Sequence, residues 1–283
     1  MPDAKALTAT AIDPGHYQDF RRFLEQSCGI VLGDNKQYLV ASRLGPLMGQ
    51  NGFRDLGELV VRLHQPGNSP LRGQVIEAMT TNETQFFRDT YPFEMLRQEL
   101  FPELQKRRTW QLRVWSAGCS SGQEAYSISM TVQEYNDSSG RLEAEIVGTD
   151  ISPGMVQQAS RARYNTSSIG RGLTPQRLQR FFTELEDGHW EVRPEIRRRA
   201  SFRQHNLLES FTLLGRFDII FCRNVLIYFS QESRRDILAR MARQLNPGGY
   251  LIVGGSESLA RQVDDFEMVR SSGGVVYRLK GDK

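Results

Sequence analysis

One stretch of the chain constrains its fold more than any other. A short apolar run at residues 112–115 enters a bend of small residues at 116–122, and a helix-like segment follows at 123–135. A second apolar run then ends in an acid, Asp150. This order of strand, bend, helix, strand and acid is typical of a nucleotide-binding α/β unit, in which the acid accepts ribose hydroxyls. The pattern predicts a site for an adenosine-containing cofactor, although an ordinary tight turn would also explain the bend alone.

The rest of the chain divides into three regions. Residues 1–80 have the apolar spacing of a helical domain, residues 81–110 form a linker and a covering helix, and residues 111–283 alternate strands and helices. Helices are expected at 16–28, 36–48, 55–64, 71–79, 91–104 and 231–245. Strands are expected at 112–116, 145–149, 201–203, 217–222 and 249–254, and a hairpin at 266–270 and 275–279.

This order predicts an α/β domain with a mostly parallel sheet and an antiparallel C-terminal hairpin. Residues from about 161 to 200 interrupt the alternation, with a short helix at 174–182 and a strand at 190–193. We interpret them as a subdomain inserted into the α/β core.

Composition excludes several classes of protein. A hydrophobic content of 39% and a charged content of 24% are ordinary for a globular chain with a sizeable core. No apolar run reaches the roughly 18 residues of a membrane span, and the N-terminus lacks the apolar core of a signal peptide. Three scattered cysteines (Cys28, Cys119 and Cys222) argue against a disulfide framework and favour a reducing cytoplasm. No cluster of His or Cys predicts a metal site.

The charge is small but uneven. The formal net charge is +3, which is weak evidence for a nucleic-acid partner. Residues 161–203 contain ten arginines and five acidic residues, a local excess that exceeds the charge of the whole chain. Such a segment either steers the protein toward an acidic surface or is simply a solvated face, and the sequence leaves both open.

Polar residues follow the other predicted strands. Asn206 and Leu207 come just after the strand at 201–203, where an Asn side chain can pair with an adenine edge. Asn224 and Tyr228 follow the strand at 217–222, and ligands of open α/β sheets bind beyond the carboxyl ends of strands. Asn82, Thr84 and Arg88 lie in the linker and are placed to close over the same site.

Four ordered motifs carry a resemblance to a known family. They are Thr81-Asn-Glu-Thr-Gln-Phe-Phe-Arg88, Val114-Trp-Ser-Ala-Gly-Cys-Ser-Ser-Gly-Gln-Glu124, Gly148-Thr-Asp150 and Phe221-Cys-Arg-Asn-Val-Leu-Ile-Tyr-Phe229, and Ser256-Glu-Ser258 fits as well. Together they closely resemble the chemotaxis receptor methyltransferase family (CheR), over nearly the whole chain. The resemblance implies a Rossmann-like methyltransferase domain with an inserted β-subdomain and an all-helical N-terminal domain. It also implies S-adenosylmethionine as cofactor, S-adenosylhomocysteine as product, and glutamate side chains of bacterial chemoreceptors as methyl acceptors.

The same resemblance implies roles for individual residues. Asp150 is expected to hold the ribose, Asn206 and Leu207 to border the adenine, and Glu124 to meet the amino-acid end of the cofactor or a neighbouring group. The remaining cofactor-binding candidates are Asn82, Thr84, Arg88, Gly118, Arg223 and Asn224, and Arg88 and Tyr228 are the catalytic candidates. Tyr228 is equally well explained as a packed aromatic, whereas for Arg88 the functional interpretation is favoured over a surface ion pair. Cys119 is interpreted as a small filler and Cys222 as a core residue.

Methyl transfer from a sulfonium needs neither a metal nor a general acid. The sulfonium leaves as a neutral thioether, and a glutamate carboxylate is already ionised at pH 7. What remains is to align the oxygen, methyl carbon and sulfur, so that orientation supplies much of the acceleration. Arg88 and Tyr228 are the residues expected to orient the carboxylate, through charge-assisted hydrogen bonds.

The chain departs from some family members in two places. Only seven residues connect Phe182 to Trp190, a short turn that resembles members which do not bind a pentapeptide at the receptor C-terminus. We therefore expect no strong pentapeptide binding. The second helix offers only Lys36 and Arg43, so its recognition of the receptor's cytoplasmic helical bundle is less strongly indicated, and the basic insertion is a candidate to share that task.

Two other classes of function compete with this one. A nucleic-acid methyltransferase would favour an Asn/Asp-Pro-Pro-aromatic motif after the fourth strand, where this chain has Arg223-Asn-Val-Leu. The second is a cofactor-sensing module without turnover, and the presence of Arg88, Asp150, Asn224 and Tyr228 argues against it. The sequence does not specify the receptor, the modified glutamates, the oligomeric state or the strength of product inhibition.

Overall fold

The computed structural model describes residues 12–107, 111–138, 141–257, 259, 264–271 and 273–281. The chain forms two compact units. The smaller contains residues up to Thr81 together with Tyr228–Arg234, and the larger contains Asn82–Ile227 and Arg235–Lys283. Ser258 of the resemblance motif lies outside the described residues.

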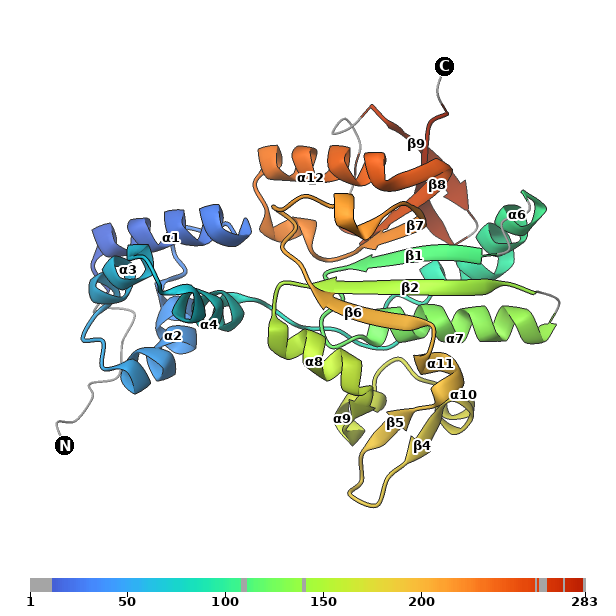
Figure 1. The fold of residues 1–283 in the computed structure, drawn as a ribbon, viewed down its shortest axis with the longest axis horizontal. Helices are drawn as coiled ribbons and strands as arrows, with labels where there is room; N and C mark the ends of the chain where they lie inside the picture. The colour runs from blue at the N-terminus through green and yellow to red at the C-terminus, as the bar shows by residue number, and fades with distance from the viewer. Residues whose placement is uncertain are drawn as a thin grey trace. The chain divides into compact units, whose positions relative to one another are not determined.

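The smaller unit is built from amphipathic helices. They are α1 (Pro14–Cys28), α2 (Gln37–Asn51), α3 (Leu56–His64) and α4 (Ser69–Met79) (Figure 1). Asp13 caps α1 by accepting a hydrogen bond of 3.0 Å from the His16 N–H, and Gly29 ends the helix with a φ of 78°. The buried side chains of α1 recur at helical spacing, so one face packs against α3.

The helix α2 is longer than the sequence predicts. The sequence predicts its end at Met48, but the helix continues through Pro46 to Asn51 and ends at Gly52, which has a φ of 73°. A proline inside a helix removes one backbone hydrogen bond. Burial of Val40, Leu44 and Met48 on one face offsets that loss.

Burial of Cys28 makes the stability of the protein sensitive to alkaline pH. Burial raises the pKa of its thiol from 9.0 to about 11. Because the folded state keeps the proton, this contribution is complete below pH 9 and is lost as the pH rises toward 11. We expect the free energy of unfolding to fall by about 2 kcal/mol between pH 8.5 and 10.5 on this account. Guanidinium titrations at both values should show a smaller fall in Cys28→Ala; an equal fall in both proteins would contradict the assignment.

A seven-stranded sheet organises the larger unit, in the order β6-β2-β1-β7-β8-β10-β9. The parallel strands are β1 (Gln111–Ala117), β2 (Glu143–Asp150), β6 (Ala200–Gln204), β7 (Phe217–Cys222) and β8 (Leu245–Val253). The hairpin of β9 (Phe266–Ser271) and β10 (Gly274–Leu279) is antiparallel. The predicted mixed sheet is confirmed. The strand order reverses between β1 and β7, the position where open α/β sheets bind ligands.

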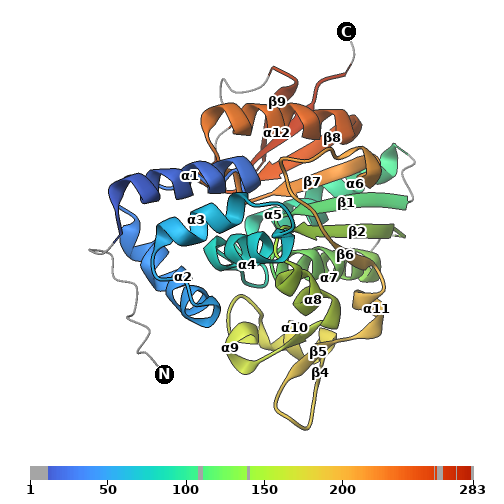
Figure 2. The ribbon, with the colours of Figure 1, turned by 60° about the vertical axis from the view of Figure 1, so that its left-hand side comes forward.

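Helices cover both faces of this sheet. Figures 1 and 2 show α7 (Gln123–Ser138) and α12 (Gln231–Gln244) on opposite sides. Val114, Ile146 and Phe221 contribute to the core on the α7 side. Trp115 points to the other face, where its ring lies 4.9 Å from that of Phe211 and its indole N–H donates to the Thr149 hydroxyl at 2.9 Å. Because alternate side chains of a strand face opposite sides of a sheet, the side chains of β1 pack on both faces.

The covering helix and the last parallel strand differ in detail from the prediction. The helix expected at 91–104 is α5 (Tyr91–Met95), a π-helical turn η2 (Leu96–Leu100) and α6 (Phe101–Lys106). Pro102 has no N–H to continue the α-helical ladder, and the Phe101 N–H reaches back to the Leu96 carbonyl instead. Strand β8 begins at Leu245 rather than 249, because Leu245 pairs with Phe217 across a register shift.

A second, three-stranded sheet lies within the predicted insertion. Its strands β3 (Arg163–Tyr164), β5 (Trp190–Val192) and β4 (Phe182–Glu184) are antiparallel, and we call them the inserted sheet. Helix α10 (Pro175–Phe181) agrees with the expected helix. The short elements α8 (Pro153–Arg161), α9 (Thr166–Ile169), α11 (Pro194–Arg197), η3 (Thr212–Leu214) and η4 (Leu226–Tyr228) complete the described structure.

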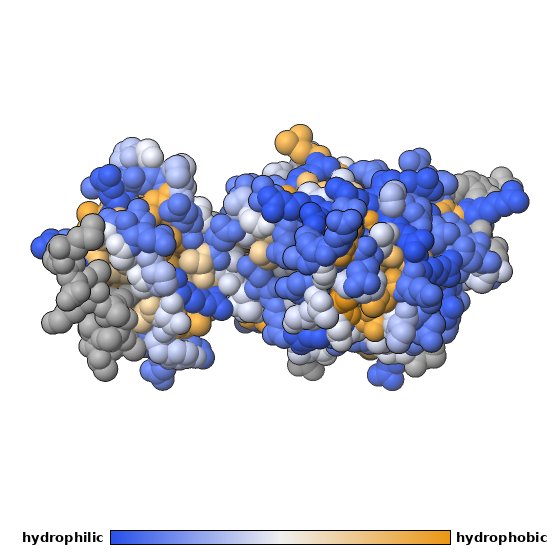
Figure 3. All heavy atoms as spheres, turned by 90° about the horizontal axis from the view of Figure 1, so that it is seen from below, coloured by the Kyte–Doolittle hydropathy of each residue, from blue (hydrophilic) through white to orange (hydrophobic). Residues whose placement is uncertain are grey.

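The surface is mostly hydrophilic on the face seen in Figure 3, with hydrophobic atoms in limited patches. Among the described residues, the large hydrophobic side chains that stay exposed include Tyr38, Val61 and Leu213. Within the same part of the chain, no helix is both long enough and apolar enough to cross a membrane.

Candidate active site

The bend between β1 and α7 wraps over the end of β2. The N–H groups of Gly118 and Cys119 both donate to the Thr149 carbonyl, at 2.8 and 2.9 Å. Gly118 and Ser120 adopt positive φ angles of 73° and 49°. A residue other than glycine or asparagine is uncommon in this region, so the Ser120 backbone is held by its surroundings. Its N–H donates to a carboxylate oxygen of Asp150 at 2.8 Å.

Two glycines of this bend have no room for a side chain. A Cβ at Gly118 would lie 2.4 Å from Cγ2 of Val225, which follows β7. A Cβ at Gly122, where φ is 94°, would lie 2.9 Å from the Ala159 Cβ of α8. The absent side chains let the bend approach both neighbours.

We expect Gly118→Ala to weaken binding of S-adenosylhomocysteine by at least about tenfold. The added methyl group collides with Val225 at a backbone conformation that already costs alanine roughly 1 kcal/mol. Adding Val225→Ala removes the collision and should restore part of the affinity. Isothermal titration calorimetry on the three variants tests this; unchanged affinity in Gly118→Ala would contradict it.

Asp150 ends β2 and is buried, with 8% of its surface exposed. One carboxylate oxygen accepts the Ser120 N–H, and the other accepts the Ser152 N–H at 3.0 Å. A carboxylate can accept hydroxyl groups of a ligand as well as backbone N–H groups, because each oxygen has two lone pairs. The aspartate is therefore held in one orientation by the bend that it supports.

The segment 82–90 lies against the same bend. The Asn82 carbonyl accepts a hydrogen bond of 2.9 Å from the Ser120 hydroxyl. Phe86 and Phe87 are buried, and the Phe87 N–H donates to the Ser127 hydroxyl of α7 at 2.9 Å. Thr84 is half-buried. These contacts fix the backbone on either side of Thr84.

Aromatic contacts anchor the two phenylalanines. The Phe86 ring lies 5.0 Å from Tyr164 and 5.3 Å from Phe182, both in the inserted sheet. The Arg177 guanidinium lies 3.7 Å from the centre of the Phe87 ring, a cation–π contact. Arg88 directly follows these two phenylalanines. It is half-buried, and its guanidinium donates to the Glu83 carbonyl at 3.2 Å. Among the described residues, Arg88 makes no ion pair, so its other N–H groups can receive a carboxylate.

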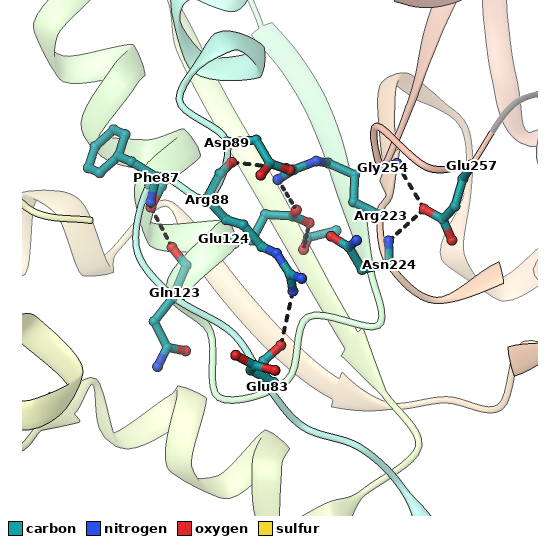
Figure 4. A network of polar contacts seen from close by, with 12 residues as sticks. Glu83, Phe87, Arg88, Asp89, Gln123, Glu124, Arg223, Asn224, Gly254 and Glu257 are labelled. Carbon is teal, nitrogen blue, oxygen red and sulfur yellow. Dashed lines mark hydrogen bonds and ion pairs between the residues drawn. The ribbon is translucent and has the colours of Figure 1, made fainter. Parts of the chain in front are cut away.

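Arg223 joins three parts of the larger unit (Figure 4). Its side chain, 1% exposed, lies 3.1 Å from Glu124 at the start of α7 and 2.7 Å from Asp89. It also donates to the Arg88 carbonyl at 2.9 Å. Glu124 in turn accepts from the Ser116 hydroxyl at 2.7 Å. The geometry makes Arg223 and Glu124 a buried pair that ties segment 82–90 to the carboxyl ends of β1 and β7.

Glu257 was given no role of its own by the sequence, yet its carboxylate accepts four backbone hydrogen bonds. Its carboxylate accepts hydrogen bonds from the N–H groups of Asn224 (2.6 Å), Val225 (3.1 Å), Ile227 (3.2 Å) and Gly254 (2.8 Å). In the sequence it was marked only as the middle residue of the Ser256-Glu-Ser258 motif, which follows a Gly-Gly pair at a strand end. Asn224, with a φ of 57°, is held by this carboxylate.

The adenine candidates follow β6. The His205 N–H donates to the Asp150 carbonyl at 2.9 Å, and the Asn206 side-chain oxygen accepts from the Leu208 N–H at 3.0 Å. Leu207 is buried, and its carbonyl accepts from Arg240 at 2.7 Å. Burial lowers the pKa of His205. This loop is therefore connected directly to the end of β2 that carries Asp150.

Tyr228 is the first residue of the segment Tyr228–Arg234, which belongs to the smaller unit. It is half-buried, and its backbone carbonyl accepts from the Val31 N–H at 2.8 Å.

Cys119, inside the bend, is fully buried, and burial raises the pKa of its thiol well above the ordinary value. A neutral buried thiol is a poor nucleophile. Within the described part of the chain, no group of three or more acidic, His or Cys residues is arranged to hold a metal ion.

The larger unit thus brings one set of candidates to the carboxyl ends of β1, β2 and β7: Asn82, Arg88, Gly118, Glu124, Asp150, Arg223 and Asn224. These residues fit an adenosyl cofactor with a charged amino-acid tail. Asp150 is a buried carboxylate at the end of β2, and the buried Oδ1 of Asn224 lacks a partner among the described residues. The glycine bend leaves backbone approachable.

This fold and site define a methyltransferase of the Rossmann-like class that uses S-adenosylmethionine. Comparison with protein families identifies the particular one. Residues 82–275 match the CheR methyltransferase, SAM binding domain, and residues 15–80 match the CheR methyltransferase, all-alpha domain. The chain belongs to the CheR family.

Relatives match over almost their full length. "Chemotaxis protein methyltransferase 1" of Pseudomonas aeruginosa is 54% identical over 268 residues, covering 93% of this chain and 97% of the relative. "Chemotaxis protein methyltransferase" of Vibrio parahaemolyticus is 48% identical, covering 97% and 100%. The Salmonella typhimurium protein of the same name is 36% identical, covering 96% and 93%. The family, the enzyme class and the cofactor expected from the sequence are confirmed.

Proposed function

We propose that this methyltransferase forms γ-methyl esters on glutamate side chains in the cytoplasmic helical bundle of bacterial chemoreceptors. One observation carries the proposal: segment 82–90, which bears Arg88, is fixed to the cofactor bend and to Arg223 within one compact unit. A carboxylate-binding arginine beside a methyl-donor site suits an acidic acceptor. The names of the relatives support chemoreceptors as the substrate.

Binding of the cofactor is assigned to the residues around the bend. Asp150 holds the ribose hydroxyls, Asn206 and Leu207 border the adenine, and Gly118 allows close backbone approach. Asn82, Thr84, Glu124, Arg223 and Asn224 surround the amino-acid end. When bound, S-adenosylmethionine supplies an activated methyl group.

Orientation of the acceptor is assigned to Arg88 and Tyr228. The Arg88 guanidinium donates one N–H to the Glu83 carbonyl, and its other N–H groups can donate to a substrate carboxylate. A bidentate hydrogen bond from arginine fixes both carboxylate oxygens and therefore the line of attack. No general base is needed, because the attacking carboxylate is already ionised at neutral pH.

A radiolabelling experiment tests this function. The protein is incubated with S-adenosylmethionine carrying a tritiated methyl group and a panel of receptor cytoplasmic fragments. We expect base-labile label on a fragment, released as methanol, and its loss in Arg88→Ala with cofactor affinity measured in parallel. Arg278→Ala, which removes a partly exposed arginine from the C-terminal hairpin, is the matched control. Label on RNA, or base-stable label on the fragment, would contradict the proposal.

We further propose that the protein does not use a C-terminal receptor pentapeptide. The connection between β4 and β5 is a tight turn, in which the Leu185 N–H donates to the His189 carbonyl at 2.8 Å. A turn this short resembles that of members without the tether. Calorimetry with a receptor C-terminal pentapeptide should detect no binding at micromolar concentrations, and a micromolar dissociation constant would overturn the proposal.

A further inference from the structure

The contacts of Glu257 converge on one loop. Residues 223–227 follow β7 and include the start of η4, and three N–H groups of this loop donate to the Glu257 carboxylate. A fourth donor, Gly254, follows the end of the neighbouring strand β8. Glu257 is buried, with 8% of its surface exposed. A single carboxylate therefore joins the carboxyl ends of two adjacent parallel strands.

This loop forms one wall of the cofactor site. Asn224 stands in the left-handed region with its side-chain Oδ1 buried and without a partner among the described residues. The next residue, Val225, lies so close to the bend that a Cβ on Gly118 would be 2.4 Å from it. A shift of the loop would move the Asn224 carboxamide and the Val225 side chain together.

We infer that Glu257 is a positioning residue of the cofactor site, which acts through Asn224 and Val225 and does not touch the cofactor itself. The inference rests on the cofactor site described above. The carboxylate accepts backbone N–H groups of this loop, and so holds Asn224 in its left-handed conformation.

The chemistry of the four contacts requires a carboxylate. Oε2 accepts from Asn224 and Gly254, and Oε1 accepts from Val225 and Ile227. A carboxylate is an acceptor at both oxygens, whereas a glutamine presents an NH2 group at one of them. In either orientation, Glu257→Gln directs that NH2 group at two backbone donors.

A pair of neighbouring glycines offers a second way to disturb the same contacts. A Cβ on Gly254 would lie 2.6 Å from Oε2 of Glu257 and 3.1 Å from the Asn224 nitrogen. A Cβ on Gly255 meets nothing within 4 Å. Gly254→Ala therefore pushes the carboxylate away from the loop, and Gly255→Ala is its matched control.

The test measures the dissociation constant of S-adenosylhomocysteine by calorimetry on the full chain. We expect Glu257→Gln and Gly254→Ala each to weaken binding by tenfold or more, and Gly255→Ala by less than twofold. In a protein that already carries Asn224→Ala, Glu257→Gln should cost less than about threefold, because its effect passes through Asn224. A general structural role would give the same cost in both backgrounds.

The possible outcomes separate the two proposals. If the wild-type protein does not bind S-adenosylhomocysteine, the cofactor site itself is wrong. If the wild type binds and Glu257→Gln binds equally well, or if the costs of Glu257→Gln and Asn224→Ala simply add, Glu257 is not a positioning residue. If Glu257→Gln does not fold, the comparison of Gly254→Ala with Gly255→Ala decides, and equal affinity in those two variants contradicts the inference.

Discussion

Replacement of Asp150 by asparagine is expected to weaken binding of S-adenosylhomocysteine by about 100-fold or more. Asparagine retains the size of the side chain but directs an NH2 group at the N–H of either Ser120 or Ser152. It also replaces the charge-assisted hydrogen bonds expected to the ribose, each of which contributes roughly 1.5–3 kcal/mol. The loss of two such bonds corresponds to at least 100-fold in affinity.

Calorimetry on Asp150→Asn provides the measurement, and Asp137→Asn provides the control. Asp137 accepts hydrogen bonds from Gln133 and Arg180 near the end of α7, away from the bend. We expect the control to bind like the wild type. If Asp150→Asn retains affinity within threefold of wild type, the ribose assignment is wrong.

The second large effect is expected from Arg223→Met. Methionine preserves much of the apolar bulk of arginine but leaves Glu124, 14% exposed, without its cation. Removal of one partner from a buried ion pair costs about 3–5 kcal/mol, because the remaining charge stays buried. In a chain of this size the midpoint of thermal unfolding should fall by about 5–10 °C. The Arg88 carbonyl also loses its hydrogen-bond donor.

Two measurements report on these two consequences. Thermal unfolding followed by circular dichroism reports the lost stability, and limited trypsin digestion reports opening of segment 82–90, because trypsin cleaves after Arg88. We expect faster cleavage at Arg88 in Arg223→Met. Arg278→Met, which breaks a partly exposed pair with Glu267, should shift the midpoint by no more than about 2 °C. Equal shifts in both variants would argue against a buried pair at Arg223.

Local sequence patterns were sufficient to predict the sheet and the bend. Alternation of apolar runs with helical spacing placed β1, β2 and β7 within a residue or two of their observed bounds, and the small residues at 116–122 predicted the turn over β2. The family motifs added the methyltransferase class and its cofactor, which the family comparison confirms. The roles of the individual site residues remain predictions.

Contacts between distant parts of the chain were not predictable in this way. Glu257 lies 30 or more residues from the loop whose N–H groups it accepts, and no periodicity connects them. The same holds for Asp89 and Arg223, which are 134 residues apart. Local propensity was also outweighed in one helix: α2 continues through Pro46 to Asn51, with Val40, Leu44 and Met48 buried on one face.

The base and the tip of the inserted sheet differ in how freely they can vary. At the base, the Tyr164 hydroxyl donates to the Ser121 carbonyl at 2.7 Å and the Phe86 ring packs on Phe182, so a change there reaches the bend between β1 and α7. At the tip, residues 185–189 contact mainly one another and Arg163. A longer hairpin at the tip would leave the contacts of Tyr164 and Phe182 at the base unchanged. The tip is therefore a region where insertions can change which partner is bound without changing the rate of methyl transfer.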